Sequence, residues 1–327
     1  MATGPKRKPP LWRIWSIALL NAVAGHTAAG FLRAARLVRR EWLADVCGPL
    51  LRHIGPWLPE HKIGRANLKA AFPEKSPDEI ETILRGVWDN LGRFAADFAH
   101  LDRLKIHDPA IPGPSDIEYS EATLARFQAL RASGKPALLF AAHVGNWELP
   151  ALVAHRYGIE ATILYRRPNV PAVADAVVRI RAGSMGNLMP SGIEAPLALA
   201  NALLAGQTVG MLVDQYYKHG VDVRFFGQIT RANPLIARLA RQIDCAIHGT
   251  RVIRLPGNRF RVEMTEAIPP VRAADGSIDT AATMQSITAV VEGWIREYPD
   301  QWLWVHRRWR PADAPAQRHK PRPVGKL

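Results

Sequence analysis

The stretch P-A-L-L-F-A-A-H-V-G-N-W-E-L-P, from Pro136 to Pro150, decides the fold. Its apolar residues 137–142 have the length and bulk of a buried strand. This run stops at His143, and the dipeptide Gly145-Asn146 then indicates a turn. The apolar residues that follow predict a helix with Asn146 near its cap. We therefore expect His143 at the carboxyl end of a strand, which is the edge where open α/β sheets bind ligands.

Glu148 lies five residues after His143. On one regular helix, residues five apart differ by roughly 140° in direction, so this pair needs the intervening turn in order to meet. A carboxylate on one imidazole nitrogen fixes the tautomer and leaves the other nitrogen free to accept a proton from a hydroxyl. The spacing thus favours a His143/Glu148 general-base pair. The alternative is a strand-end histidine bonded to backbone, with Glu148 favoured in the first turn by the helix dipole.

Segments with strand character alternate with segments of helical character along most of the chain. This alternation predicts an α/β fold with a mostly parallel central sheet flanked by helices. The sequence Ser76-Pro77-Asp78-Glu79 carries a cap, a proline and a capping-box glutamate, and it predicts a helix start. The expected strands are 137–142, 161–164, 188–190, 208–213, 221–226, 246–253 and 260–264. The expected helices after the first are 121–131, a helix from Pro171 that carries Arg179 and Arg181, 193–205, 233–243 and 281–297.

Length and composition bound the class of protein. A chain of 327 residues with 48% hydrophobic residues can bury a sizeable core. Its formal net charge of +14 indicates an anionic partner, such as a nucleic acid, an acidic membrane surface, or an acidic protein or substrate. The two cysteines, Cys47 and Cys245, provide neither a disulfide framework nor a metal cluster, and we expect both to be plain buried residues.

The ends of the chain differ from its middle. Residues 1–10 form a basic arm, residues 11–40 an expected membrane-anchoring helical segment, residues 41–310 the α/β domain, and residues 311–327 a basic tail that we expect to be disordered. Within the anchoring segment, residues 14–32 are nearly long enough to span a bilayer, and basic residues flank them on both sides. The segment can span the membrane or lie in its interface; the alternative is a buried N-terminal helix.

The central stretch H-V-G-N-W-E-L-P, residues 143–150, resembles the H-x4-D/E motif of glycerolipid-type acyltransferases, in the version found in bacterial lipid A biosynthesis acyltransferases. Further blocks resemble the same family from residue 67 to residue 310, in the same order. They are N-L-K-A-A-F-P-E at 67–74, Y-R-R-P-N at 165–169, R-I-R at 179–181, L-V-D-Q at 212–215, V-R-F-F-G at 223–227 and E-Y-P-D-Q-W-L-W-V-H-R-R-W at 297–309.

The resemblance implies an O-acyltransferase that needs no metal or cofactor. It implies His143 as the general base and Glu148 as the acid that orients it. Arg179 and Asp214 match other functional positions of the family, and we expect them to bind substrate, with Arg166 as a candidate phosphate contact. An arginine near the pair could hold an anionic group or stabilise an oxyanion, whereas the alternative for Arg179 is a solvated helix face.

The resemblance further implies an acyl carrier protein as donor of a fatty acyl chain and a hydroxyacyl chain of a lipid A precursor as acceptor. The expected location is the bacterial cell inner membrane, with anionic lipids as a partner and the catalytic domain facing the cytoplasm. One alternative is an acyltransferase that acts on another membrane lipid, such as a phosphatidylinositol mannoside or a glycerol or ornithine lipid. A second alternative is a non-catalytic basic protein that binds membranes or nucleic acid, although aromatic residues are not interleaved with basic ones as a stacking platform requires, so we expect no nucleic acid as a partner.

Overall fold

The computed structural model describes residues 26–27, 30–107, 113–168 and 171–310. The basic arm 1–10, the tail 311–327 and most of the expected anchor lie outside this part of the chain. None of the helices that the structure describes combines the length and the apolar character needed to cross a bilayer. The N-terminal membrane segment therefore stays a prediction.

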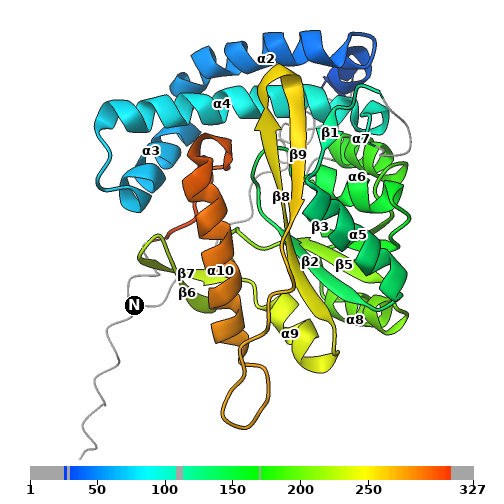
Figure 1. The fold of residues 1–327 in the computed structure, drawn as a ribbon. Helices are drawn as coiled ribbons and strands as arrows, with labels where there is room; N and C mark the ends of the chain where they lie inside the picture. The colour runs from blue at the N-terminus through cyan, green and yellow to red at the C-terminus, as the bar shows by residue number, and fades with distance from the viewer. Residues whose placement is uncertain (1–25, 28–29, 108–112, 169–170, 311–327) are drawn as a thin grey trace, which may run out of the picture.

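A seven-stranded sheet forms the centre of the molecule (Figure 1), and its strand order is β1-β9-β8-β2-β5-β3-β4. β2 lies between β5 and β8 and runs parallel to both, while β3 is parallel to β5 and β4. β9 is antiparallel to β8, but the other pairs named here are parallel. The sheet is therefore mostly parallel, as expected. The strands are β1 (Ile117–Glu118), β2 (Ala137–Ala141), β3 (Ala161–Tyr165), β4 (Asn187–Pro190), β5 (Thr208–Leu212), β8 (Ala246–Leu255) and β9 (Arg259–Met264).

Helices cover both faces of the sheet, and two long ones, α2 and α4, cross one end of the molecule (Figure 1). β6 (Val221–Phe225) and β7 (Gln228–Ala232) form a separate antiparallel hairpin. The α-helices are α2 (Arg40–Ile54), α3 (Pro59–Ala71), α4 (Pro77–Ala99), α5 (Glu121–Ser133), α6 (Leu149–Arg156), α7 (Pro171–Ala182), α8 (Ala195–Leu204), α9 (Leu235–Gln242) and α10 (Thr280–Glu297), and 3₁₀ turns lie at Gly55–Trp57, Leu101–Arg103, Pro256–Asn258 and Pro299–Gln301.

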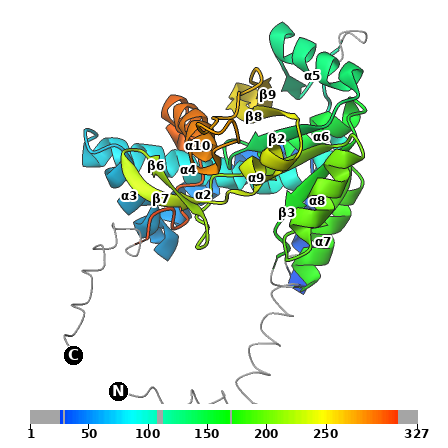
Figure 2. The same ribbon diagram turned by 90° about the horizontal axis from the view of Figure 1, so that it is seen from below.

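The alternation of side chains along β2 gives the two faces of the sheet separate cores. Leu138 and Phe140 pack with residues of α8, α9 and α10, whereas Leu139 packs with residues of α5 and α6. In the view of Figure 2, α10 lies to one side of β2, and α6 and α7 lie to the other. The face that carries Leu139 also lines the largest cavity described below.

Each strand and helix expected from residue 121 onward is present, with ends that differ by a few residues. The expected helix start at Ser76 is confirmed, because Ser76 and Glu79 form a capping box in which each side chain bonds the other residue's backbone N–H. β1 and β7 were not predicted. β1 has only two residues, and β7 (Q-I-T-R-A) has a single fully apolar long side chain, so neither has the apolar pattern of a core strand.

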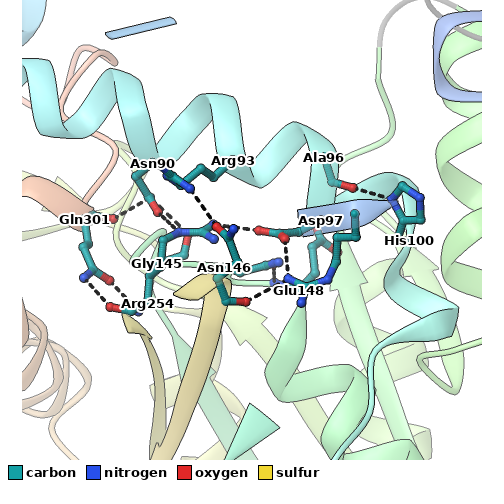
Figure 3. Close-up of polar contacts among 12 residues, drawn as sticks. Asn90, Arg93, Ala96, Asp97, His100, Gly145, Asn146, Glu148, Arg254 and Gln301 are labelled. Carbon is teal, nitrogen blue, oxygen red and sulfur yellow. Dashed lines mark hydrogen bonds and ion pairs between the residues drawn. The ribbon is translucent and has the colours of Figure 1, made fainter. Parts of the chain in front are cut away.

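A buried polar network joins the two long helices to the sheet (Figure 3). Asp97 of α4 is fully buried between two cations, Arg40 of α2 at 3.1 Å and Arg254 of β8 at 2.7 Å. Asn90, two turns earlier on α4, accepts a hydrogen bond from Arg254 and donates one to the carbonyl of Gly145. The turn after β2 is thus bonded directly to α4.

The close crossing of α2 and α4 depends on a glycine. A Cβ at Gly92 would lie 2.1 Å from the backbone carbonyl oxygen of Cys47, whereas a Cβ at Gly293, within α10, would meet no atom within 4 Å. We expect Gly92→Ala to separate the helices and to lower the free energy of unfolding by about 1–3 kcal/mol or more. Gly293→Ala should raise it by about 0.5–1 kcal/mol, because alanine loses less conformational freedom in a helix.

Urea unfolding of the two variants and the parent protein measures both changes. Equal effects of the two substitutions would show that the helix crossing does not depend on the absence of a side chain at Gly92.

Candidate active site

The sheet places His143 and Asp214 side by side. β2 and β5 are parallel neighbours, and Ala141 is paired with Leu212 at their carboxyl ends. His143 and Asp214 each lie two residues beyond this pair. The imidazole Nδ1–H donates a hydrogen bond of 2.8 Å to Oδ1 of Asp214, and the backbone N–H of His143 donates one of 2.9 Å to Oδ2. The same carboxylate therefore holds both the ring and the backbone of His143.

Asp214 is a buried anion. Its Oδ2 also accepts a hydrogen bond of 2.7 Å from the indole N–H of Trp302. Burial by itself would raise the pKa of the Asp214 carboxyl, but the charge of His143 and the hydrogen bonds from its ring and backbone lower that pKa well below its usual range. The carboxylate is thus ionised at neutral pH, as the orienting partner of a catalytic imidazole must be.

Backbone hydrogen bonds join the C-terminal segment 301–304 to the turn that carries His143. Leu303 donates its backbone N–H to the carbonyl of His143, and Gly145 donates its own to the carbonyl of Gln301. Gly145 has φ +60°, and a Cβ there would lie 2.3 Å from the carbonyl oxygen of Val252. The turn therefore requires glycine, and two segments far apart in the sequence hold it in place.

The second imidazole nitrogen faces the cavity. Because Nδ1 carries the proton donated to Asp214, Nε2 is an acceptor, and the side-chain amide of Gln215 lies 3.3 Å from it. The indole of Trp147 lies against the ring, with centroids 5.1 Å apart, and is itself stacked on Phe94 at 4.0 Å. The His143 side chain is 12% exposed. It is positioned to accept a proton from a group that replaces Gln215.

The expected contact between Glu148 and His143 is wrong. Glu148 binds Arg181 of α7 instead, through hydrogen bonds of 2.9 Å from Nε and 2.5 Å from Nη2. The reason is topological: Asp214 comes from the strand next to β2 and reaches Nδ1 directly, while Glu148 starts α6 and faces α7. The Glu148–Arg181 pair remains close to His143, because all three side chains line one cavity.

This cavity has a volume of about 570 Å³ and lies on the α6–α7 face of the sheet. Polar residues gather at its end near the carboxyl edge of the sheet, and apolar residues surround the opposite end. The polar set includes His143, Glu148, Arg166, Arg181, Gln215 and Asn233, and the apolar set includes Leu139, Ala154, Ala161, Ile163, Met185 and Leu188. The shape and chemistry fit a long apolar group whose reactive end lies at His143.

The three residues that were expected to bind substrate lie in different surroundings. Arg166 lines the cavity, and its expected contact with phosphate stays a prediction. Arg179 does not: it lines a smaller cavity of about 360 Å³ together with Arg33 and Arg36. Residues two apart on a helix point roughly 200° away from each other, so Arg181 faces the site and Arg179 faces away from it. Asp214 holds His143 rather than substrate, because both of its oxygens are bonded within the protein.

Sequence reasoning did not foresee the roles of Trp302 and Arg181. Trp302 is a fully buried core residue, and its indole N–H also donates a hydrogen bond to Asp214. Arg181 was noted only as part of the R-I-R block. His143 and Asp214 each follow directly on an expected strand, but this similarity indicates a contact only when β2 and β5 are known to be neighbours. In the ranges that the structure describes, no group of His, Cys, Asp and Glu side chains is arranged to hold a metal ion.

The fold and the His143–Asp214 pair define an α/β protein whose site can activate a hydroxyl group beside an apolar cavity. Residues 15–311 match the family model described as bacterial lipid A biosynthesis acyltransferase, so the chain belongs to this family of acyl-transferring enzymes. The chain is also similar to the lipid A biosynthesis acyltransferase 2 of Shigella flexneri. The two are 22% identical over 268 residues, which cover 79% of this chain and 81% of the relative.

A second histidine, the buried His306, makes the free energy of unfolding depend on pH. Burial lowers the pKa of His306 from 6.5 to about 4, although the charge of Asp214 opposes this shift. The folded protein then binds fewer protons than the unfolded chain between pH 6.5 and 4, so its free energy of unfolding falls as the pH falls through that window, by about 3 kcal/mol. The lowered pKa of Asp214 affects the free energy of unfolding at lower pH, because its stabilising charge is lost only as the pH falls below the ordinary range of a carboxyl.

Urea unfolding at pH 7, 6, 5 and 4 measures this dependence. His306→Asn should be less stable at pH 7 but should show a smaller loss toward pH 4, whereas His53→Asn, at an exposed histidine of α2, should keep the slope of the parent. Equal slopes in all three proteins would contradict the assignment to His306.

Proposed function

We propose that the protein transfers a fatty acyl chain from an acyl carrier protein thioester to a hydroxyl on a hydroxyacyl chain of a lipid A precursor. The observation that carries this proposal is the His143–Asp214 pair at the polar end of a cavity whose other end is apolar. Membership of the lipid A family and the name of the Shigella relative support the acceptor. The transfer needs no metal or cofactor.

In this mechanism Asp214 keeps the proton of His143 on Nδ1, and Nε2 acts as the general base. The acceptor hydroxyl takes the place of the Gln215 amide and gives its proton to Nε2 as its oxygen attacks the thioester carbonyl. A carbon–oxygen bond forms and the carbon–sulfur bond breaks. The imidazolium then returns the proton to the departing thiolate, so the site ends as it began.

Cations near the reacting groups have a separate role. Arg181 is held by Glu148 beside the cavity, and Arg166 is exposed at its polar end. We propose that Arg166 contacts phosphate groups, which both the acceptor and the prosthetic arm of the carrier protein possess. The formal charge of +14 suits three anionic partners, namely the carrier protein, the phosphorylated lipid and the membrane surface.

We propose a location at the inner membrane, with the catalytic domain on the cytoplasmic side, and the exposed apolar residues support the membrane contact. Seven of the large exposed hydrophobic side chains fall between residues 31 and 58: Phe31, Leu37, Trp42, Val46, Leu50, Trp57 and Leu58. Trp42, Val46 and Leu50 recur every four residues and form a stripe along α2, opposite the face that packs on α4. Arg39 is also exposed there and suits anionic headgroups.

An assay of the purified full-length protein with an acyl carrier protein thioester and a lipid A precursor tests the function, and the mass of the product is measured. We expect Asp214→Asn to lower kcat by about a thousandfold or more. Oδ2 receives two N–H donors, so the asparagine oxygen occupies its place and the amide N–H points at Nδ1. The imidazole then carries its proton on Nε2 and cannot act as a base.

Glu148→Gln is the matched control, since it neutralises the other nearby carboxylate but leaves the tautomer of His143 unchanged. Its loss of kcat should be smaller than that of Asp214→Asn, with thermal unfolding used to confirm that both variants fold. The opposite ranking would assign the orienting role to Glu148. Failure of the parent protein to acylate the precursor, with transfer to another membrane lipid, would keep the chemistry and change the acceptor.

The location is tested with the triple variant Trp42→Ser, Val46→Ser and Leu50→Ser in the full chain. We expect its partition onto vesicles with anionic lipids to fall severalfold, because apolar burial and charge act together at an interface. The control variant replaces Ile193, Leu197 and Leu204, which are even more exposed but lie outside this stripe. If both triple variants bind equally well, the stripe on α2 is not the membrane contact.

A further inference from the structure

The apolar end of the large cavity is built as a ladder of side chains that descends from His143. On parallel strands, paired residues point to the same face, and every second residue returns to it. The first rung below His143 is the pair Ala141 and Leu212. The second rung joins Leu139, Gly210 and Ile163 across β2, β5 and β3. All five residues line the cavity.

Ala161 forms a third rung with Thr208 and also lines the cavity. Ala154 of α6 and Met185 line this deepest part as well, and the three side chains are at most 2% exposed, so the cavity is closed there. By the rise of a strand, the second rung lies roughly 13 Å from the level of His143 and the third roughly 20 Å from it. The cavity is therefore a slot with one open, reactive end.

The second rung has no side chain at its central position, which is Gly210, and the end of the Ile163 side chain lies against this glycine. A Cβ at Gly210 would lie 2.8 Å from Cδ1 of Ile163, so even one added carbon would force that side chain to move. Gly210 does not have a positive φ, and the backbone itself therefore does not require glycine. Ile163 remains partly exposed although its strand lies inside the sheet, consistent with space beside it.

We infer that Gly210 sets the length of the fatty acyl chain that the enzyme transfers. This inference rests on the proposed function and adds to it the residue that determines donor specificity. The donor carbonyl must sit beside His143, so its alkyl chain runs down the slot, passes Gly210 and Ile163 and ends near Ala161. A side chain at Gly210, together with the Ile163 side chain that it displaces, narrows the slot at the second rung, whereas a larger side chain at Ala161 removes only its end.

The experiment offers the full-length enzyme a mixture of acyl carrier protein thioesters with saturated chains of increasing even length, and the products are weighed by mass spectrometry. We expect Gly210→Ala to move the preference to shorter chains, with the best parental donor losing about tenfold or more against a chain two carbons shorter. Gly210→Val should shorten the preferred chain further, and Ala161→Val should shorten it less than Gly210→Val does.

Val209→Ile is the matched control. Val209 is buried on the opposite face of the same strand and packs in the other core, so the substitution adds one carbon without entering the slot. It should keep the parental chain-length profile even if it lowers stability. The same shift in Val209→Ile would assign the effect to strain in β5 rather than to the slot.

The outcomes separate this inference from the function on which it rests. A parent protein that transfers no acyl group overturns the proposed function. Active Gly210 variants with the parental donor profile overturn the inference alone. A change in the preferred acceptor lipid, with donor preference unchanged, would overturn it too, because the slot would then hold a chain of the acceptor.

Discussion

The parallel pairing of β2 with β5 is the constraint on which the rest of the site depends. Because Ala141 and Leu212 end their strands in register, the residues two positions later meet at the carboxyl edge of the sheet. Asp214 can then bind both the ring and the backbone of His143. A shift of the register by one residue would turn Asp214 to the other face, so the pair exists only with this alignment. The same pairing forms the ladder of the apolar slot.

Segments from the two ends of the domain stabilise this arrangement. The C-terminal segment bonds the turn after β2 on both sides, and Trp302 holds the carboxylate of Asp214. From the N-terminal side, Asn90 of α4 donates a hydrogen bond to the carbonyl of Gly145. Asp97, two turns later on the same helix, lies between two arginines. A buried carboxylate between two cations is costly to disrupt, because removal of one charge leaves the others unpaired. Hydrogen bonds within the protein therefore position the His143–Asp214 pair and the turn that carries His143.

Much of the fold could be predicted, because its local signals are strong. The apolar run before His143 became β2, and Ser76 and Glu79 became a capping box. The site was harder to predict, since it depends on which strands are neighbours. His143 and Asp214 were both identified, but Glu148 was expected to orient the imidazole and instead binds Arg181. Arg179 and Arg181 are two residues apart, and only the packing of α7 shows which of them faces the cavity.

Sequence alone determined the α/β class, most strands and helices, and the family to which the motifs point. Those features arise from local patterns: the alternation of apolar runs with turns, a capping box, and short blocks of unusual residues. Only the tertiary structure decided the partner of His143, the place of Trp302, and the slot that Gly210 lines. The physical reason is that contacts across parallel strands join residues 71 positions apart, and strand order, not sequence spacing, sets which side chains meet.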